Sequence, residues 1–321
     1  MTIPVSVVIP TYNQSKLLQE TVDSILSQRY EPAEVVILDD GSTDDTKDVV
    51  ARMPAKVKYV YKTNGGICSA RNAGVASAQS AFIAFCDHDD LWREDKLEQQ
   101  MDLHQSMPTL NYSFTNYSVV SDGVWAKETK FDSAPAGFFD SSFVPLGRNL
   151  ICESSLYLKL LNFQPIFPST VVMKKELYES LGGANEKFGK NPAEDRNLTL
   201  QCVHIPPLGV VTDPVVGIRK HATNYSGNLL RNALGEIDIL NHALETHPIG
   251  DTEKAAIRER LEVIRKDASY DAFATSNFAQ CREFLSAVPR DQLDSQMRMK
   301  LLISGLPRPL AKAIHSLVVK K

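Results

Sequence analysis

Residues 81–92, AFIAFCDHDDLW, begin as an apolar run and end on three carboxylates, Asp87, Asp89 and Asp90. The apolar half is typical of a buried β-strand. Ligands of open α/β sheets bind at the carboxyl ends of the strands, which is where these carboxylates would lie. The stretch therefore predicts a strand of such a sheet with a polar site at its end.

Strand patterns and helix patterns alternate along the first part of the chain. VSVVI is a β-rich run, and SKLLQETVDSILSQ follows it with Leu18, Val22 and Ile25 on one helical face. The unit repeats as a strand that ends in Asp39 and Asp40 and a helix with an acidic first turn. This order predicts a mostly parallel sheet flanked by helices, whose strand ends bring PTYN, DDGS and DHDD to one edge.

The composition is that of a soluble globular protein, since 43% of its 321 residues are hydrophobic and 23% are charged. A net charge of −4 without a long basic run gives no support to a nucleic-acid partner. The five cysteines form no CxxC pair, which favours free thiols in a reducing compartment. The N-terminus lacks the basic region of a signal peptide, and no run approaches the roughly 20 apolar residues of a membrane span. We therefore expect a cytoplasmic protein.

The pattern changes twice along the chain. Alternating strands and helices fill about residues 1–105, and the stretch 106–228 is less regular, with a Gly- and Pro-rich loop of the kind that shapes pockets. Residues 229–321 have helical spacing, as in TEKAAIRERLEVIRK. Acidic and basic side chains interleave there as on solvated faces. An interaction surface and simple packing onto the main domain are equally open roles for this helical region.

The acidic cluster admits other interpretations. A solvated turn is common, and a DxD triplet alone is weak evidence. A calcium loop that starts at Asp87 would put Leu91 at a ligand position and Trp92 where a glycine is required, so that interpretation fails. What remains is a carboxylate pair at a strand end that binds a hard cation and, through it, phosphate. Asp90 is then expected to cap the following helix.

Seven motifs occur in one order along residues 3–228. They are VSVVIPTYN, VVILDDGSTDDT, NGGICSARNAG, FIAFCDHDDLWREDKL, STVVMKKELYESLGGANEKFG, PAEDRNLTLQ and GIRKHATNYSGN. In these motifs the chain resembles the inverting nucleotide-sugar glycosyltransferases of glycosyltransferase family 2, which have the GT-A fold. The resemblance implies a Rossmann-like α/β domain over 1–228, with a nucleotide-binding half at about 1–105 and an acceptor-binding half at 106–228. An all-helical region at 229–321 lies outside it.

The resemblance also implies which residues bind the base of the donor. Pro10, Thr11 and Tyr12 match the first loop of the family, which contacts the base. Asp40 matches the carboxylate that accepts the imide N–H of uracil in a charge-assisted hydrogen bond. A helix cap is the competing role of Asp40. Thymine carries the same imide, so UDP is the expected nucleotide and dTDP the alternative.

Further positions are implied to contact the ribose and the phosphates. Asn64, Gly65 and Arg71 match the loop beside the base and ribose, where glycine permits close approach and the guanidinium can stack or pair. A surface ion pair is the competing role of Arg71. Asp87 would face the ribose, and Lys220 belongs to a segment that closes over the donor phosphates.

The remaining residues that the resemblance implies bind the metal ion or accept the proton of the acceptor. Asp89 would bind Mn²⁺ or Mg²⁺, and His221 would contact metal or phosphate, with structural packing equally open for that histidine. Asp195 matches the general base of the family, and its neighbour Glu194 stays open as an alternative. A helix cap is the competing role of Asp195.

The activity that the resemblance implies is that of a hexosyltransferase in polysaccharide biosynthesis. It would move a sugar from a nucleotide-sugar donor to a hydroxyl group of a glycan or lipid-linked acceptor, in one metal-assisted displacement that inverts the anomeric centre. Peripheral association with the inner face of a membrane is compatible with it. The main alternative is a non-catalytic sugar-nucleotide or glycan-binding module that acts through its helical region. A nicotinamide-dependent oxidoreductase would need GxGxxG where PTYN stands.

Overall fold

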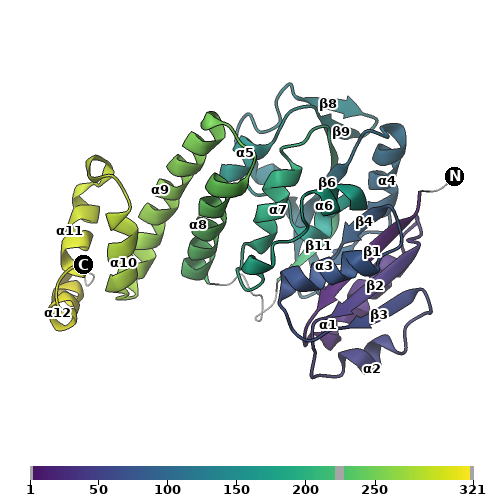
Figure 1. Cartoon of the computed structure of the whole chain (residues 1–321), viewed down its shortest axis with the longest axis horizontal. Coiled ribbons are helices and arrows are strands. Elements are labelled where there is room, and N and C mark those ends of the chain that lie inside the picture. The colour runs from purple at the N-terminus through teal and green to yellow at the C-terminus, as the bar shows by residue number, and fades with distance from the viewer. Residues whose placement is uncertain (1–2, 221–227, 319–321) are drawn as a thin grey trace. The chain divides into compact units, whose positions relative to one another are not determined.

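The computed structural model describes residues 3–220 and 228–318, and the chain forms two compact units. The first spans Met1–Lys190 and Glu194–Asn224, and the second spans Asn191–Ala193 and Tyr225–Lys321 (Figure 1). The change from α/β to helical pattern predicted at 228/229 lies close to this division.

Within the described residues, an eleven-stranded sheet forms the frame of the first unit. Its strands are β1 (Val5–Thr11), β2 (Glu34–Asp39), β3 (Val57–Tyr61), β4 (Phe82–Phe85), β5 (Leu91–Trp92), β6 (Tyr112–Ser121), β7 (Val124–Thr129), β8 (Phe143–Leu146), β9 (Asn149–Cys152), β10 (Val171–Lys174) and β11 (Leu208–Lys220). The main path runs β3-β2-β1-β4-β10-β6-β11-β9-β8, while β5 pairs with β11 and β7 pairs with β6.

The part of the sheet that contains β1 to β4 is parallel, as predicted. β1 pairs in parallel with β2 and β4, and β2 pairs in parallel with β3. The connections between them contain α1 (Ser15–Leu26), α2 (Thr46–Val50) and α3 (Ile67–Ser77). Beyond β4 the sheet is mixed, because β10 runs antiparallel to both β4 and β6, whereas β6 and β11 are again parallel. The chain leaves β1 where the strand order reverses, which is the place where open α/β sheets bind ligands.

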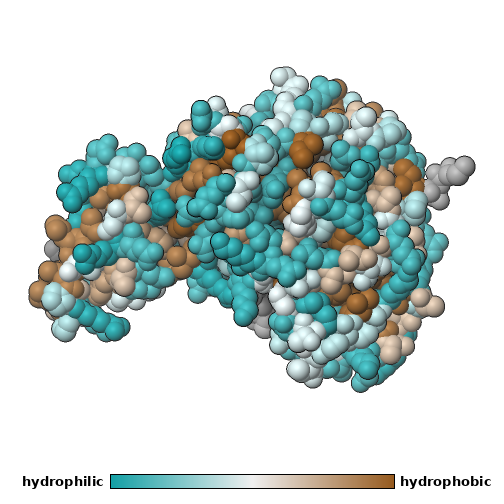
Figure 2. Space-filling model, viewed as in Figure 1, coloured by the Kyte–Doolittle hydropathy of each residue, from teal (hydrophilic) through white to brown (hydrophobic). Residues whose placement is uncertain are grey.

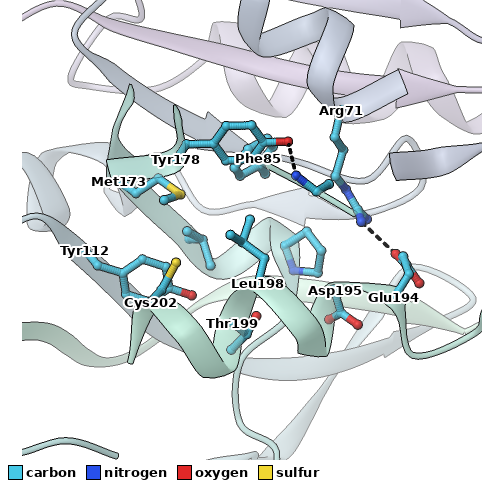
Figure 3. Close-up of a pocket in the computed structure, with 13 residues that line it drawn as sticks. Arg71, Phe85, Tyr112, Met173, Tyr178, Glu194, Asp195, Leu198, Thr199 and Cys202 are labelled. Atoms are coloured by element: carbon cyan, nitrogen blue, oxygen red, sulfur yellow. Dashed lines mark hydrogen bonds and ion pairs between the residues drawn. The ribbon is translucent and has the colours of Figure 1, made fainter. Parts of the chain in front are cut away.

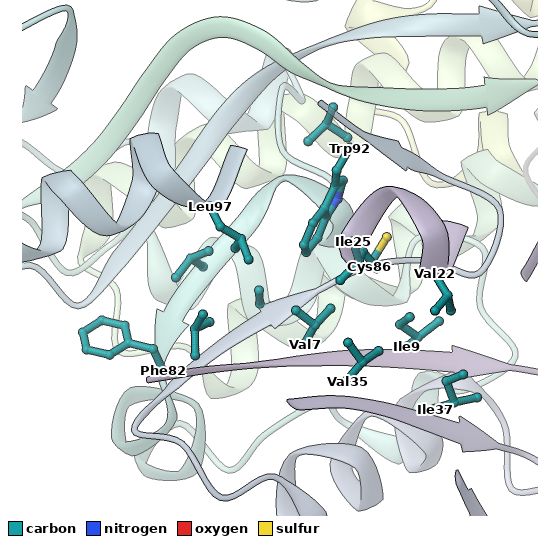
Figure 4. Close-up of a cluster of buried hydrophobic side chains, with 14 of the residues drawn as sticks. Val7, Ile9, Val22, Ile25, Val35, Ile37, Phe82, Cys86, Trp92 and Leu97 are labelled. Carbon is teal, nitrogen blue, oxygen red and sulfur yellow. The ribbon is translucent and has the colours of Figure 1, made fainter. Parts of the chain in front are cut away.

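Helix α1 covers one face of these parallel strands. Its side chains Leu18, Val22 and Ile25 are fully buried, as their spacing predicted. They belong to one apolar cluster with Val7 and Ile9 of β1 (Figure 4). Each such side chain contributes about 1.5 to 3 kcal/mol when it is buried. The cluster therefore fixes the position of β1 and of the loop at its carboxyl end.

The middle of the first unit is more regular than its sequence suggested. Its helices are α4 (Lys96–Ser106), α5 (Tyr157–Asn162), α6 (Lys175–Ser180) and α7 (Glu194–Cys202), with short 3₁₀ turns at Phe131–Ser133, Pro168–Thr170 and Glu186–Phe188. The Gly- and Pro-rich loop contains β8, which pairs with β9 as an antiparallel hairpin. The five cysteines of the chain are all free, as predicted, and the structure buries each of them.

The second unit is helical. Its elements are α8 (Leu229–Thr246), α9 (Asp251–Ala274), α10 (Phe278–Ser286), a 3₁₀ turn at Arg290–Gln292, α11 (Ser295–Ser304) and α12 (Arg308–Val318). Ile257, Leu261 and Ile264 form the buried face of α9, and Arg260 pairs with Glu236 of α8 at 2.9 Å. Over the parts of the chain that the structure describes, we find no helix with the length and apolar character to cross a membrane.

Candidate active site

The loop after β1 is tied to the loop after β2. The Asp40 N–H donates to the Thr11 carbonyl oxygen at 2.9 Å, and the Asn13 N–H donates to Ser42 Oγ at 2.9 Å. Asn13 has a φ of +53°, a conformation that asparagine tolerates better than most residues. Thr11 is buried by this arrangement, whereas Tyr12 is exposed at the edge of the sheet. An aromatic ring is thereby presented where the parallel strands end.

Asp40 is buried, and three donors meet its carboxylate. Lys62 Nζ and the Gly65 N–H donate to Oδ1 at 2.7 and 3.0 Å, and the Gly66 N–H donates to Oδ2 at 2.8 Å. Gly66 has a φ of +88°, which glycine adopts without strain. A carboxylate offers about four lone-pair positions, so about one remains for a further donor. Asp40 therefore shapes the loop at residues 64–66 and keeps one acceptor position.

In the turn before α2, backbone N–H groups donate to carboxylates other than that of Asp40. Asp39 Oδ1 accepts from the Ser42 N–H at 2.7 Å, and Asp44 Oδ1 accepts from the Thr46 N–H at 3.1 Å. Among the described residues, no side chain caps α2, whose N-cap residue is Asp45, and the carboxylate of Asp40 is used by Lys62, Gly65 and Gly66, so the competing role of Asp40 as a helix cap is not the one observed.

The acidic cluster after β4 is a turn, in which the Asp90 N–H donates to the Asp87 carbonyl oxygen at 3.2 Å. The side chains of Asp87 and Asp89 are half-buried. His88 Nδ1 lies 3.4 Å from the carbonyl oxygen of Pro10, so the turn touches the end of β1. The predicted first-loop residues therefore lie next to the turn that holds Asp87, predicted to face the ribose, and Asp89, predicted to bind the metal.

Asp90 does not cap a helix, and that prediction is wrong. Helix α4 begins only at Lys96, after Asp95. Asp90 is buried and accepts hydrogen bonds from Ser169 Oγ at 2.5 Å and from the Arg219 N–H at 3.0 Å. Burial, with the charges of the neighbouring aspartates, raises its pKa well above the ordinary value. Asp90 thus joins the turn to the end of β11.

Arg71 of α3 bridges two carboxylates that are far apart in the sequence. Its Nη2 lies 3.2 Å from Asp87 Oδ1. Its Nη1 lies 2.6 Å from Glu194 Oε1, a contact that is marked in Figure 3. The arginine is buried, so it is not the surface ion pair considered from the sequence. Charge-assisted hydrogen bonds of this kind are among the stronger ones in proteins. The bridge fixes the start of α7 against the end of β4.

Asp195 lies in the first turn of α7, directly after Glu194. Burial raises the pKa of Asp195 to about 7, and the negative charge of Glu194 adds to the rise while Arg71 opposes it. A carboxylate with a pKa near neutrality is suited to accept a proton at physiological pH.

A cavity of about 40 Å³ lies beside these groups (Figure 3). Arg71, Glu194 and Asp195 line its polar side, and apolar side chains such as Phe85 and Leu198 line the rest. Asp195 is half-buried, and the apolar walls limit the water around it, which is the physical origin of the burial contribution to its pKa.

The carboxylates of the turn fit a hard divalent cation. Among the residues that the structure describes, no three histidine, cysteine or acidic side chains converge as they do in an all-protein metal site. Mg²⁺ is ordinarily held by one or two carboxylates together with substrate phosphates, and Mn²⁺ prefers the same oxygen ligands. Asp87 and Asp89 are carboxylates of that kind at the ligand edge of the sheet. His221, the other predicted metal ligand, lies outside the described residues.

For two further predicted site residues, the structure gives the loop or strand to which they belong. Asn64 belongs to the loop that Asp40 holds through Gly65 and Gly66. Lys220 is exposed at the last position of β11, a strand that lies beside β6. Its predicted contact with donor phosphates stays a prediction.

The sequence interpretation missed two polar side chains of this edge. Lys62 follows the end of β3 and binds Asp40, and Ser169 accepts from the Asp87 N–H at 2.9 Å while it donates to Asp90. Lys62 could have been found because it follows a strand end, as the other site residues do. Ser169 opens one of the seven motifs, but nothing local marks it as a partner of the acidic turn.

Comparison with known proteins gives a family and a fold. Residues 6–165 match the family model described as "Glycosyl transferase family 2". A protein of Escherichia coli named "UDP-Glc:alpha-D-GlcNAc-diphosphoundecaprenol beta-1,3-glucosyltransferase WfaP" is 35% identical over 122 residues, which are 37% of this chain and 48% of that protein. The chain spans about half the length, or less, of the curated relatives that it matches.

Two solved structures have a similar fold. TarS 1–349 of S. aureus, in complex with UDP-GlcNAc, has a TM-score of 0.63 at 18% identity, with 98% of this chain and 92% of that chain covered. The mannosyltransferase PcManGT of Pyrobaculum calidifontis, in complex with GDP-Man and Mn²⁺, has a TM-score of 0.57 at 20% identity, with 99% and 88% covered. The fold is the GT-A fold with a helical C-terminal region, and the chain belongs to glycosyl transferase family 2.

Proposed function

We propose that the chain is an inverting glycosyltransferase that moves a sugar from a UDP-sugar to a hydroxyl group of a glycan or lipid-linked acceptor. The observation that carries the proposal is Asp195, whose pKa of about 7 suits a general base, in a site built at the ligand edge of the sheet. Transfer by one displacement requires such a base for the acceptor hydroxyl and positive charge for the leaving diphosphate.

Asp195 is a better candidate for the base than Glu194. Arg71 Nη1 donates to Glu194 Oε1 at 2.6 Å, so that carboxylate is engaged in a charge-assisted hydrogen bond. Asp195 takes the proton of the attacking hydroxyl, and Arg71 with Glu194 holds the first turn of α7 in place. The oxygen of the acceptor then attacks the anomeric carbon, and the bond between that carbon and the diphosphate breaks.

The donor would bind at the ends of β1 and β2. The acceptor position left on Asp40 suits the imide N–H of uracil, and the exposed ring of Tyr12 can contact a base. Two observations support a uridine nucleotide as the donor. The name of WfaP specifies UDP-Glc, and the TarS complex contains UDP-GlcNAc. The GDP-Man complex of PcManGT makes a guanine nucleotide the alternative.

The charge of the leaving diphosphate needs cations. A bound Mn²⁺ or Mg²⁺ would supply Lewis acidity at the diphosphate. Asp89 would hold it through a carboxylate oxygen, Asp87 would face the ribose, and Lys220 would add a positive charge from the end of β11. The Mn²⁺ of the PcManGT complex supports this choice of ion.

The proposed class of acceptor, a lipid-linked sugar, is taken from the name of a relative. The name of WfaP specifies a sugar linked through diphosphate to undecaprenol as its acceptor, and we extend the lipid-linked class, without the particular sugar, to this chain. Such acceptors are used in the assembly of polysaccharides.

The test is release of nucleoside diphosphate from a panel of UDP-Glc, UDP-GlcNAc and GDP-Man with a lipid-linked sugar acceptor. We expect one UDP-sugar to be used, with an α-linked donor giving a β-linked product. Asp195→Asn should lower turnover by roughly 10² to 10⁴, the usual contribution of a general base, and should barely change donor affinity. Donor binding without release by the unaltered chain would instead support a non-catalytic binding module.

A further inference from the structure

The last helix of the second unit does not turn its leucines inward. Ala311 of α12 is fully buried, and the ring of His315 lies 5.0 Å from that of Phe273 and 5.6 Å from that of Phe278, between ring centres. A helix on the surface of a globular protein ordinarily turns its largest apolar side chains inward. In α12 the inward positions are occupied by Ala311 and His315, with Ile314 half-buried beside them, so its leucines have another orientation.

Those leucines are exposed. Leu310 and Leu317 are seven residues apart, hence on one face of α12, and are 50% and 75% exposed. Leu302 of α11 is 74% exposed, and Leu306, in the turn between the two helices, is exposed as well. Figure 2 shows apolar side chains gathered over the end of the unit where α11 and α12 lie. We refer to these four residues as the leucine surface.

The segment that carries the leucine surface is strongly basic, although the chain as a whole has a net charge of −4. Residues 295–321 contain no aspartate or glutamate, and their basic residues are Arg298, Lys300, Arg308, Lys312, Lys320 and Lys321. Lys300 is turned inward, with Nζ 3.3 Å from the ring centre of Tyr270, whereas Arg298, Arg308 and Lys312 are exposed. Lys320 and Lys321 lie outside the described residues.

We propose that the leucine surface of α11 and α12 docks on an anionic lipid bilayer. Exposed leucines on a helix with basic side chains and no acidic ones are typical of helices that lie in the membrane interface. Lysine and arginine stems can run along the apolar zone while their charges reach the lipid phosphates. A second copy of the chain is a less suitable occupant, because pairing would bring two basic segments together without acidic partners. The proposal does not rest on sugar transfer, since lipid binding is measured directly.

The test is co-sedimentation of the full chain with vesicles of phosphatidylcholine alone and of phosphatidylcholine with phosphatidylglycerol. We expect binding to the anionic vesicles that weakens as salt is raised, and little binding to the neutral ones. The variant Leu302→Ser/Leu310→Ser/Leu317→Ser should bind at least about tenfold more weakly, since each leucine loses its burial in the interface. Its matched control is Leu229→Ser on α8, a leucine that is 72% exposed, which should bind like the unaltered chain.

Charge is tested with Arg308→Glu/Lys312→Glu, against Arg258→Glu on α9 as an exposed control. Each basic residue near an anionic surface contributes about fivefold to binding, so the double reversal should weaken it by more than about 25-fold. The proposal is overturned if the unaltered chain does not bind anionic vesicles, or if the leucine variant binds as well as Leu229→Ser. Sedimentation equilibrium that shows a dimer lost in the leucine variant, with no vesicle binding, would assign the surface to a second copy. Circular dichroism of each variant checks that its helices are retained.

Discussion

The proposed base, Asp195, should set the pH dependence of transfer, and Glu194→Gln should move it. The pKa of Asp195 is raised to about 7 by burial and then by the charge of Glu194. A general base acts when ionised, so kcat/KM should rise with pH through this value. With a pKa of about 7 the ionised fraction changes from about one-tenth at pH 6 to about nine-tenths at pH 8, a factor of about ten.

Glu194→Gln removes the charge that helps to raise the pKa of Asp195 and leaves the contribution of burial. The amide oxygen of glutamine still accepts a hydrogen bond from Arg71, so the start of α7 keeps its position. The neighbouring negative charge is lost, and the pKa of Asp195 therefore falls. The acidic limb of the profile should move to lower pH, and the ratio of kcat/KM at pH 8 to that at pH 6 should drop below about ten.

The assay is the initial rate of nucleoside diphosphate release at subsaturating donor between about pH 5.5 and pH 9. Glu179→Gln is the matched control, because this glutamate of α6 is exposed, pairs with Lys175 at 3.8 Å and does not line the cavity. Its profile should coincide with that of the unaltered chain. An acidic limb that stays in place in Glu194→Gln, or one that persists in Asp195→Asn, would refute the assignment of the base.

Substitutions at three further positions test the rest of the site. Asp40→Asn should weaken UDP binding by roughly tenfold to 100-fold, the equivalent of about 1.5 to 3 kcal/mol for a hydrogen bond to a charged group, and calorimetry with ADP as the control should give little change. Asp89→Ala should abolish the dependence of UDP binding on Mn²⁺ or Mg²⁺, whereas chelator should remove activity from the unaltered chain; full activity after chelation would contradict the role. Asp90→Ala should lower the free energy of unfolding by about 2 to 4 kcal/mol, because the Ser169 hydroxyl and the Arg219 N–H lose their acceptor, and Asp90→Asn should cost less in the same urea titration.

The parallel strands with their covering helix, and the polar edge, could be predicted because their signals are local. The spacing of Leu18, Val22 and Ile25 defines a helix face without knowledge of the rest of the chain, and all three are buried. Strand ends are equally local, so Asp40 and Asp87 were placed at the correct edge by sequence alone. The antiparallel strands beyond β4 were not predicted, because pairing partners such as β10 and β4 are about 90 residues apart and no periodicity encodes them.

Local signals fail where one residue type serves two purposes. An aspartate after a strand and before a helix is equally suited to cap the helix or to bind across the structure. Asp90 was predicted to cap, yet its acceptors are used by Ser169 and Arg219, which are contributed by segments distant in the chain. The order of residues predicts that a carboxylate is present at this edge but not which donor it meets.

Local sequence also fails to show which distant groups the proposed base meets. Such distant groups explain why two adjacent carboxylates can differ in role. Glu194 and Asp195 start one helix, and the sequence offers no local feature that separates them. The difference arises from α3, which supplies Arg71 to Glu194, and from β4, which supplies Phe85 to the apolar wall beside Asp195. One carboxylate is engaged by a buried cation, while burial raises the pKa of the other toward neutrality. Because both effects come from residues far away in the sequence, a change at Arg71 or Phe85 should alter proton transfer at Asp195 as surely as a change in α7 itself.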